Sequence, residues 1–192
     1  MSESPNLHQL PDGLPVPSDD GAADHLRGVR LPSLQLPSTA GRSVDLSALG
    51  GRTVVYCYPR TGRPGEKLPD GWDAIPGARG CTPQSCAFRD HHTELLALGA
   101  SVFGLSTQST EYQREAVERL HLPFELLSDA NLSLASALKL PTFRAGSMVL
   151  LKRLTMVLKA GVVEYVFYPV FPPDKNAEQV IAWLAGNKVP AG

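Results

Sequence analysis

The chain is organised around the stretch Arg79-Gly80-Cys81-Thr82-Pro83-Gln84-Ser85-Cys86-Ala87-Phe88-Arg89-Asp90. Thr82 and Pro83 predict the start of a helix, because a threonine hydroxyl accepts hydrogen bonds from free backbone N–H groups and proline tolerates the first helical position. Cys81 is then expected just before the helix, and Cys86 in its second turn. The positive end of the helix dipole and the nearby Arg79 both favour the thiolate of Cys81, which is the nucleophilic form. We therefore expect Cys81 to be reactive.

Length and composition are those of one globular domain. The chain has 192 residues, of which 43% are hydrophobic, and a formal net charge of -1. A charge this close to zero argues against binding to nucleic acid or to a membrane surface. Residues 1–26 lack the basic start and apolar segment of a secretory signal, and no apolar run reaches the length of a membrane span. We therefore expect a cytoplasmic protein, in which cysteines are more often catalytic or redox-active than structural.

The first 26 residues differ in composition from the rest of the chain. They contain several prolines among Ser, Asp and Gly, namely Pro5, Pro11, Pro15 and Pro17. This composition predicts an extended or disordered leader over residues 1–26, with a strap docked on the body as the other possibility. The main domain is expected to cover residues 27–192. It would open with a short edge hairpin, because the leucines of residues 31–36 alternate and proline is compatible with an edge strand.

The middle and end of the chain alternate between strand and helix patterns. Residues 53–58 are apolar on both faces and predict a central strand that is covered on both sides. Further strands are expected at 101–106 and 124–127, followed by an antiparallel hairpin of residues 148–158 and 162–168. Helices are expected from just after Cys81 to about Leu98, from a capping box at Thr110, at 131–138, and from a cap at Asn176. The pattern predicts an α/β fold with a mixed central sheet and helices on both faces.

A long loop from Gly62 to Ala78 separates the central strand from the cysteine stretch. Its Pro-Gly and Pro-Asp-Gly steps indicate turns, and loops of this length in compact domains are often functional. Trp72 and Ile75 are expected to attach it to the body.

The spacing of the two cysteines constrains their chemistry. On a regular helix, five residues correspond to a rise of roughly 7.5 Å and place the Cα atoms about 8–9 Å apart. A disulfide needs a Cα separation of roughly 4.4–6.8 Å. A redox-active pair would therefore require the first turns to unwind on every cycle, and the polar Gln84-Ser85 step is expected to suit such unfolding. A zinc site, which needs two further ligands, and a pair of inert thiols are the alternatives.

The cysteine stretch and a late arginine-bearing strand resemble the peroxiredoxins. The resemblance rests on the strand that ends in Tyr58-Pro59, on Gly80-Cys81-Thr82 and on Phe88-Arg89-Asp90, with a late strand from Arg153 to Leu158. The five-residue cysteine spacing is similar to that of the PrxQ or bacterioferritin-comigratory group, an atypical 2-Cys group. The similarity covers roughly residues 28–185 and implies a thioredoxin-like fold.

The resemblance also implies roles for three residues. Cys81 would be the peroxidatic thiolate, Cys86 the resolving thiol, and Arg153 the cation beside the reacting oxygens. A guanidinium suits an anionic sulfur and a developing alkoxide, although an arginine that faces water from an edge strand is the alternative. The implied function is a thiol peroxidase that reduces hydrogen peroxide or alkyl hydroperoxides and is recycled by thioredoxin or a similar dithiol reductant. It would need no cofactor and would act as a monomer or weak dimer.

Two features leave other interpretations open. The family has a threonine three residues before the reactive cysteine, where this chain has Ala78, so the activating hydroxyl could come from Thr61 or Thr82 or be missing. Cys57 lies in the central strand and is expected to be a packing residue. A thiol-disulfide oxidoreductase on the same fold is a rival function, although that chemistry favours the Cys-x-x-Cys spacing. A redox-switched binding protein is the other rival.

Overall fold

The fold is built on a five-stranded mixed sheet, in a computed structural model that describes residues 6–188. The strand order is β5-β4-β3-β8-β9, so β3 is central as predicted. β3 pairs in parallel with β4, and β4 pairs in parallel with β5, whereas β8 and β9 form an antiparallel hairpin beside β3. The strands are β3 (Arg52–Cys57), β4 (Ala100–Ser106), β5 (Glu125–Ser128), β8 (Leu154–Lys159) and β9 (Val162–Phe167).

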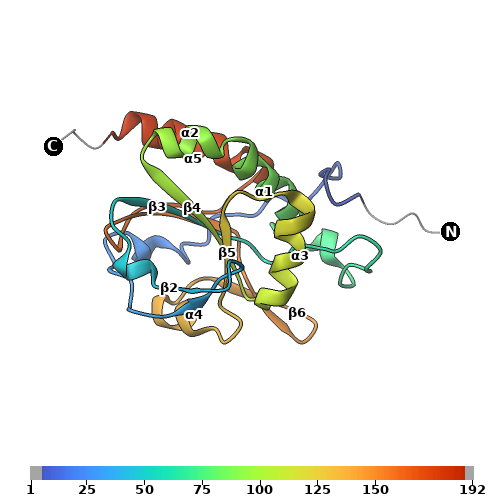
Figure 1. Cartoon of the computed structure of the whole chain (residues 1–192). Helices are drawn as coiled ribbons and strands as arrows, with labels where there is room; N and C mark the ends of the chain where they lie inside the picture. Colours follow the sequence, from blue (N-terminus) through green and yellow to red (C-terminus); the bar gives the residue numbers. More distant parts are fainter. Residues whose placement is uncertain (1–5, 189–192) are drawn as a thin grey trace.

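Helices cover both faces of this sheet (Figure 1). Alternate residues of β3 point to opposite faces, which explains why every residue of this strand is buried. Val54 and Tyr56 pack against one group of helices, and Val55 and Cys57 pack against α4 on the other side. The first group is α1 (Cys81–Asp90), α2 (His92–Ala97), α3 (Thr110–Leu120) and α5 (Asn176–Gly186), and α4 covers Ser133–Leu138. The predicted mixed sheet with helices on both faces is confirmed.

Three predicted helix caps are wrong, by two residues in α1 and by one residue in α3 and α5. α1 begins at Cys81 rather than after it, and its N-cap is Gly80 in the left-handed region instead of the Thr82 side chain. α3 is capped by the Ser109 hydroxyl, which accepts from Tyr112 N, one residue before the predicted Thr110. The cap of α5 is Lys175, which makes no capping hydrogen bond with its side chain, and Asn176 is buried in the helix. The single helix expected to reach about Leu98 is two helices, α1 and α2, which meet at His91.

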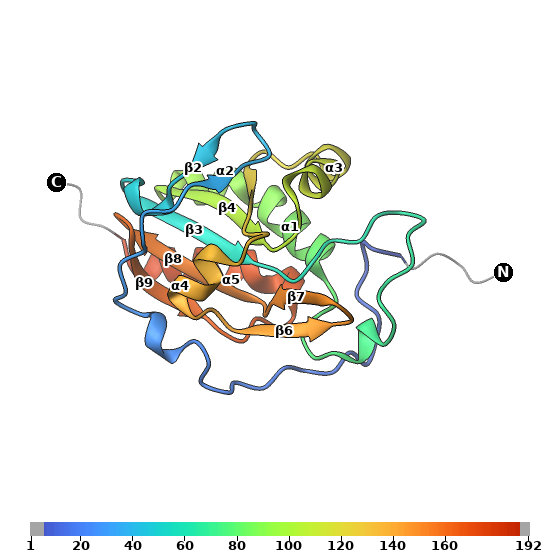
Figure 2. The same cartoon turned by 90° about the horizontal axis from the view of Figure 1, so that it is seen from below.

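The strand expected over residues 148–158 belongs to two different sheets. β7 (Met148–Leu151) pairs with β6 (Thr142–Ala145) in a separate hairpin, and β8 begins only at Leu154. Lys152 and Arg153 lie in the break between these strands. Figure 2 shows the β6–β7 hairpin and α4 on the face of the sheet opposite to α5. The edge hairpin expected near residue 36 is present as β1 (Leu36–Pro37) and β2 (Ser43–Val44).

The loop from Gly62 to Ala78 packs on the β6–β7 hairpin. Trp72 is buried with Ala78, Ala145 and Leu150, and Ile75 packs against this cluster, so the expected attachment of the loop is confirmed. The loop contains one short 3-10 helix, η3 (Trp72–Ala74). The other 3-10 helices are η1 (Asp24–Leu26), η2 (Leu46–Ala48) and η4 (Pro173–Lys175).

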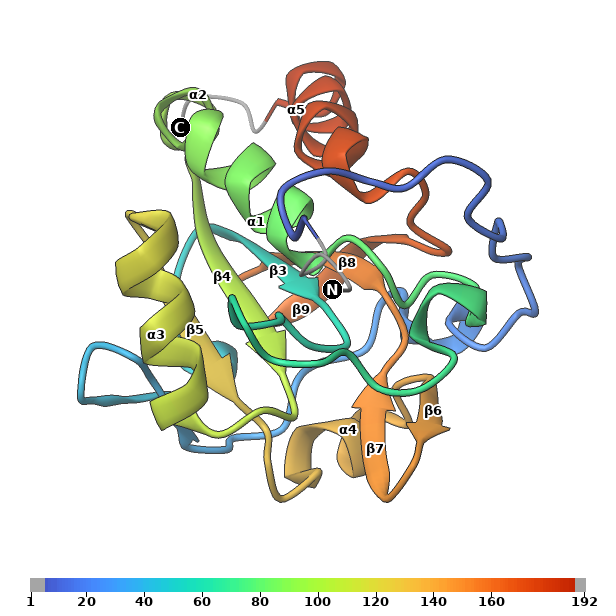
Figure 3. The ribbon, with the colours of Figure 1, turned by 90° about the vertical axis from the view of Figure 1, so that its right-hand side faces the viewer.

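Residues 6–20, which we call the strap, run along the body beside the start of α1 (Figure 3). The Asn6 carbonyl accepts from Arg79 Nη2 at 3.2 Å, near the beginning of the strap. At its end, Asp20 accepts from Lys152 Nζ at 2.6 Å and from the Tyr168 hydroxyl at 2.7 Å. Residues 1–5, which include Pro5, lie outside the described part of the chain. No helix between residues 6 and 188 is both long and apolar enough to cross a membrane.

Candidate active site

Cys81 lies at the first position of α1, where the backbone turns sharply. The turn is made by Gly80, whose φ of 106° favours glycine because side chains rarely adopt this conformation. A Cβ at Gly80 would lie only 2.3 Å from Pro173 Cγ and 2.8 Å from Leu10 Cδ2, so these two residues close over the helix start. Cys81 itself is only 3% exposed. Its sulfur therefore sits at the positive end of a helix and away from bulk water.

Arg153 is the cation that contacts this sulfur. Its Nη2 lies 3.2 Å from Cys81 Sγ and also donates to the carbonyl oxygens of Ala78 at 3.1 Å and Arg79 at 3.2 Å. Its Nη1 donates to Gln84 Oε1. Arg153 is 3% exposed, so the alternative of an arginine that faces water is wrong. Cys81 and Arg153, which the family resemblance assigned to one site, are therefore in direct contact although they are 72 positions apart in the sequence.

One donor of Arg153 remains unpaired beside the sulfur. Arg153 Nε is buried and has no hydrogen-bond partner among the described residues. Nε and Nη2 form one edge of a guanidinium, and Arg42 and Arg52 use this edge to hold the two oxygens of a carboxylate. An oxygen that accepts from Arg153 Nε would therefore lie next to the sulfur that Nη2 contacts. Other buried donors also lack a hydrogen-bond partner among the described residues, including Nε of Arg60 and Nε of Arg63. The place of Arg153 Nε beside the sulfur, and not its lack of a partner alone, makes it a candidate for binding a substrate oxygen.

The other groups expected near the sulfur lie elsewhere. Arg79 points its guanidinium at Asp73, with Nη1 3.0 Å from Oδ1, so only one of the two arginines acts on Cys81. The Thr61 hydroxyl donates to Gln108 Oε1 at 3.3 Å. Within residues 6–188, the hydrogen bonds of Cys81 Sγ are those with Arg153 and with the Ala78 carbonyl, at 3.8 Å. No threonine hydroxyl is bonded to the sulfur in this part of the chain.

A buried polar network supports Arg153, and sequence reasoning missed it. Gln84, which accepts from Arg153, donates through Nε2 to Asn176 Oδ1 at 3.0 Å. Asn176 Oδ1 also accepts from the Thr155 hydroxyl at 2.7 Å. Thr155 follows Arg153 by two residues, so both side chains point to the face covered by α1 and α5. The only sequence signals were a glutamine within the cysteine stretch and an asparagine that reads as a helix cap.

The expectation that the Gln84-Ser85 step unfolds easily is wrong. Both residues are fully buried, and the Ser85 hydroxyl accepts from the Tyr56 hydroxyl at 3.0 Å. Phe88, one turn further on, stacks on the Tyr56 ring with centroids 4.5 Å apart. Unwinding this helix therefore breaks hydrogen bonds between buried groups, each of which costs about 1–3 kcal/mol when a partner is left unpaired.

Cys86 lies on the same continuous helix as Cys81, and all three cysteines are free thiols. Cys86 is half-buried. Burial raises the pKa of this thiol, and the positive charges of Arg89 and Arg119 oppose that rise. Cys57 is fully buried in β3, where burial raises the pKa of its thiol strongly, in agreement with its expected packing role. Among residues 6–188, no group of three or more His, Cys, Asp or Glu side chains is placed to hold a metal ion.

The chain matches known proteins along most of its length. The Redoxin family model matches residues 26–181. Peroxiredoxin Q of Sedum lineare chloroplasts is 34% identical over 164 residues, which cover 84% of this chain and 79% of the relative. This chain belongs to the peroxiredoxins, a family of thiol peroxidases. The chloroplast peroxiredoxin Q of Oryza sativa subsp. japonica is also 34% identical to this peroxiredoxin, over 160 residues. The matched segment covers 82% of this chain and 66% of that relative's length.

Solved structures agree with the fold. The crystal structure of the peroxidoxin BcpB from Mycobacterium tuberculosis has a TM-score of 0.68 and 26% identity, covering 85% of this peroxiredoxin and 98% of that chain. Peroxiredoxin Q from Xanthomonas campestris has a TM-score of 0.66 at 22% identity, covering 84% of this chain and 98% of its own. The thioredoxin-like fold and the similarity to the PrxQ or bacterioferritin-comigratory group are thus confirmed.

Proposed function

We propose that this peroxiredoxin reduces hydrogen peroxide or alkyl hydroperoxides with Cys81 as the peroxidatic thiol, Cys86 as the resolving thiol and Arg153 as the stabilising cation. The observation that carries the proposal is the contact of 3.2 Å between Arg153 Nη2 and Cys81 Sγ, with Nε of the same edge unpaired. A fixed cation beside the sulfur favours the thiolate. The same guanidinium can hold the peroxide oxygen that the sulfur attacks.

In the first step, the Cys81 thiolate attacks the terminal oxygen of the peroxide. A sulfur–oxygen bond forms, the oxygen–oxygen bond breaks, and the leaving alkoxide or hydroxide takes up a proton to become an alcohol or water. Arg153 Nε donates to the oxygen that gains negative charge, while Nη2 remains on the sulfur. The sulfur is oxidised to sulfenic acid and the peroxide is reduced.

In the second step, Cys86 loses its proton and its sulfur attacks the sulfenic sulfur of Cys81. The sulfur–oxygen bond breaks, the hydroxide takes up the proton and leaves as water, and a Cys81–Cys86 disulfide forms. The two residues lie on one continuous helix, so the first turns of α1 must unwind before the sulfurs can meet. Thioredoxin or a similar dithiol then reduces the disulfide by thiol–disulfide exchange. A reducing compartment, such as the cytoplasm in which we expect the protein, would contain such dithiols.

Steady-state consumption of hydrogen peroxide with a thioredoxin system tests the proposal. We expect turnover by the unaltered protein and none by Cys81→Ser. Cys86→Ser should consume a single equivalent of peroxide and stop at sulfenic acid, because the peroxidatic thiol remains and the resolving thiol is lost. Cys57→Ser is the matched control, since Cys57 is buried on the opposite face of β3, and it should keep full turnover. Loss of the single equivalent in Cys86→Ser would show that the two roles are wrongly assigned.

A further inference from the structure

The turn of α1 that carries Cys81 is held on both sides by the segment that leads into α5. Pro173, in η4, closes over Gly80, where a Cβ would lie 2.3 Å from Pro173 Cγ. Asn176, the first residue of α5, accepts from Gln84 Nε2 at 3.0 Å. Gly80 directly precedes Cys81, and Gln84 lies three residues after Cys81. The same segment therefore contacts the reactive turn before and after the residue that carries the sulfur.

The guanidinium of Arg153 is held at two of its nitrogens. Nη2 contacts Cys81 Sγ and the carbonyl oxygens of Ala78 and Arg79. Nη1 donates to Gln84 Oε1, which is its partner within residues 6–188. Contacts at Nη2 alone would fix one corner of this planar group and leave the group free to turn about that corner. The bond to Gln84 therefore sets the direction in which the edge formed by Nε and Nη2 faces.

Gln84 can hold Arg153 in only one orientation of its amide group. A guanidinium donates hydrogen bonds and accepts none, so Gln84 must present Oε1 to Arg153 and Nε2 to the opposite side. Nε2 is then a buried donor that needs an acceptor, and Asn176 Oδ1 is that acceptor. The Thr155 hydroxyl donates to the same oxygen at 2.7 Å, which fixes the Asn176 amide in turn. The orientation of Gln84 thus depends on the oxygen of Asn176.

We propose that Asn176 is a positioning residue of the peroxidatic site, which acts through Gln84 to hold Arg153 against the Cys81 sulfur. The inference rests on the proposed peroxidase function and adds a residue from α5 to the site. Without the Asn176 oxygen, Gln84 Nε2 is buried and unpaired, so the Gln84 side chain is no longer held against Arg153. The guanidinium is then free to turn, and Nε no longer faces an oxygen that lies beside the sulfur.

Second-order rate constants for Cys81 oxidation by hydrogen peroxide, measured by stopped flow, test this inference. Asn176→Leu removes the oxygen at similar side-chain volume and should lower the rate constant about fivefold or more. Asn176→Asp keeps an oxygen that accepts from Gln84 and Thr155, and negative charge is favoured at the start of a helix. Its rate constant should therefore stay within about twofold of that of the unaltered protein. Equal losses in the two variants would show that the oxygen is not the functional group and would overturn the inference.

A double-mutant cycle shows whether Asn176 acts through Gln84. Gln84→Leu removes the direct partner of Arg153 and should lower the rate constant by at least as much as Asn176→Leu. Adding Asn176→Leu to Gln84→Leu should then lower the rate constant by no more than about a further twofold, because the series of hydrogen bonds is already broken. If Asn176 only stabilised the fold, the two losses would multiply. Multiplied losses would therefore refute the positioning role.

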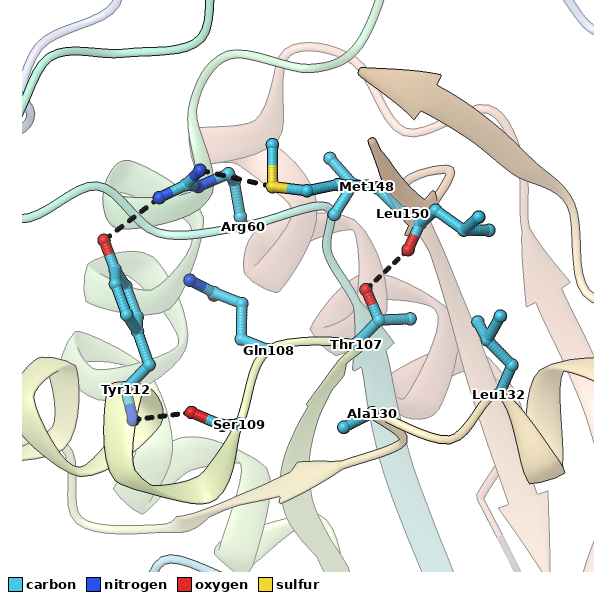
Figure 4. A pocket seen from close by; sticks show the side chains of 10 residues that line it. Arg60, Thr107, Gln108, Ser109, Tyr112, Ala130, Leu132, Met148 and Leu150 are labelled. Carbon is cyan, nitrogen blue, oxygen red and sulfur yellow. Dashed lines mark hydrogen bonds between the residues drawn. The ribbon is translucent and has the colours of Figure 1, made fainter. Parts of the chain in front are cut away.

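The matched control makes the same substitution at two threonines. Thr155→Val removes the hydroxyl that donates to Asn176 and should lower the rate constant about threefold. The Thr107 hydroxyl donates to the Val149 carbonyl at 2.8 Å, beside a cavity of about 360 Å³ between α3 and β7 (Figure 4). No residue of the proposed site lines that cavity, so Thr107→Val should leave the rate constant unchanged. An equal loss in both valine variants would contradict the inference, whereas failure of the unaltered protein to react with hydrogen peroxide would refute the peroxidase function itself.

Discussion

Replacing Tyr56 by phenylalanine isolates one hydrogen bond that exists only while α1 is intact. The Tyr56 hydroxyl donates to Ser85 Oγ at 3.0 Å, and both residues are fully buried. Burial raises the pKa of Tyr56, so the phenol stays protonated and acts as the donor. Ser85 lies between the two cysteines and must leave its position when they form a disulfide. The reduced protein therefore has this bond and the disulfide form lacks it.

The magnitude follows from this difference between the two states. Loss of a buried hydrogen bond costs the reduced form about 1 kcal/mol, whereas the disulfide form loses nothing. Since 30 mV corresponds to about 1.4 kcal/mol for a two-electron couple, the reduction potential should fall by about 20 mV. The sign is negative because destabilising the dithiol makes the disulfide harder to reduce.

Equilibration against glutathione or thioredoxin redox buffers measures this shift. Thr53→Val is the matched control, because the Thr53 hydroxyl bonds Ser101 Oγ at 3.2 Å between β3 and β4, away from α1. It should destabilise both redox states equally and leave the potential unchanged. An unchanged potential in Tyr56→Phe, or an equal shift in both variants, would refute the idea that α1 unwinds through Ser85.

Three further changes have expected outcomes. Arg153→Ala should slow Cys81 oxidation by about 10²–10³-fold in stopped flow, and urea unfolding should show a loss of about 1–3 kcal/mol for each buried acceptor left unpaired. In Cys81→Ser, the alkylation rate of Cys86 should rise steadily through pH 9, because the raised pKa of the Cys86 thiol keeps it protonated below that pH. A plateau of the rate below pH 8 would contradict this. Gly80→Ala should lower the free energy of unfolding by about 1–2 kcal/mol or more, because alanine is strained in the left-handed backbone conformation and its methyl group would also clash with Pro173. Unchanged urea unfolding would show that the turn tolerates a side chain.

Local patterns in the sequence were enough to predict the central strand and the helix that carries the cysteine stretch. Residues 53–58 are apolar on both faces, and the structure places them in β3 at the centre of the sheet. The alternation of apolar residues depends only on neighbours along the chain, so such elements can be recognised without knowledge of the fold. The contact between Arg153 and Cys81 was expected only through the family resemblance, because no local rule connects residues 72 positions apart.

The environment of the site could not be predicted, because it depends on contacts between distant segments. Gln84 and Ser85 were expected to unfold easily because they are polar. Their partners are buried groups on three other segments, namely Arg153, Asn176 and Tyr56. Arg79 was expected to act on the Cys81 sulfur because the two residues are close in sequence. Its guanidinium instead donates to the Asp73 carboxylate. Helix starts were misplaced for a local reason, since glycine in the left-handed region caps α1 without a side chain.

Peptide mapping by mass spectrometry after one equivalent of hydrogen peroxide tests the central claim most directly. The reduced protein is treated with peroxide in the absence of reductant, alkylated and digested, and the fate of each cysteine is recorded. We expect one disulfide between Cys81 and Cys86, with Cys57 alkylated as a free thiol after unfolding. Recovery of Cys81 as an alkylated free thiol, or a disulfide that includes Cys57, would contradict the assignment of Cys81 and Cys86 as the peroxidatic pair.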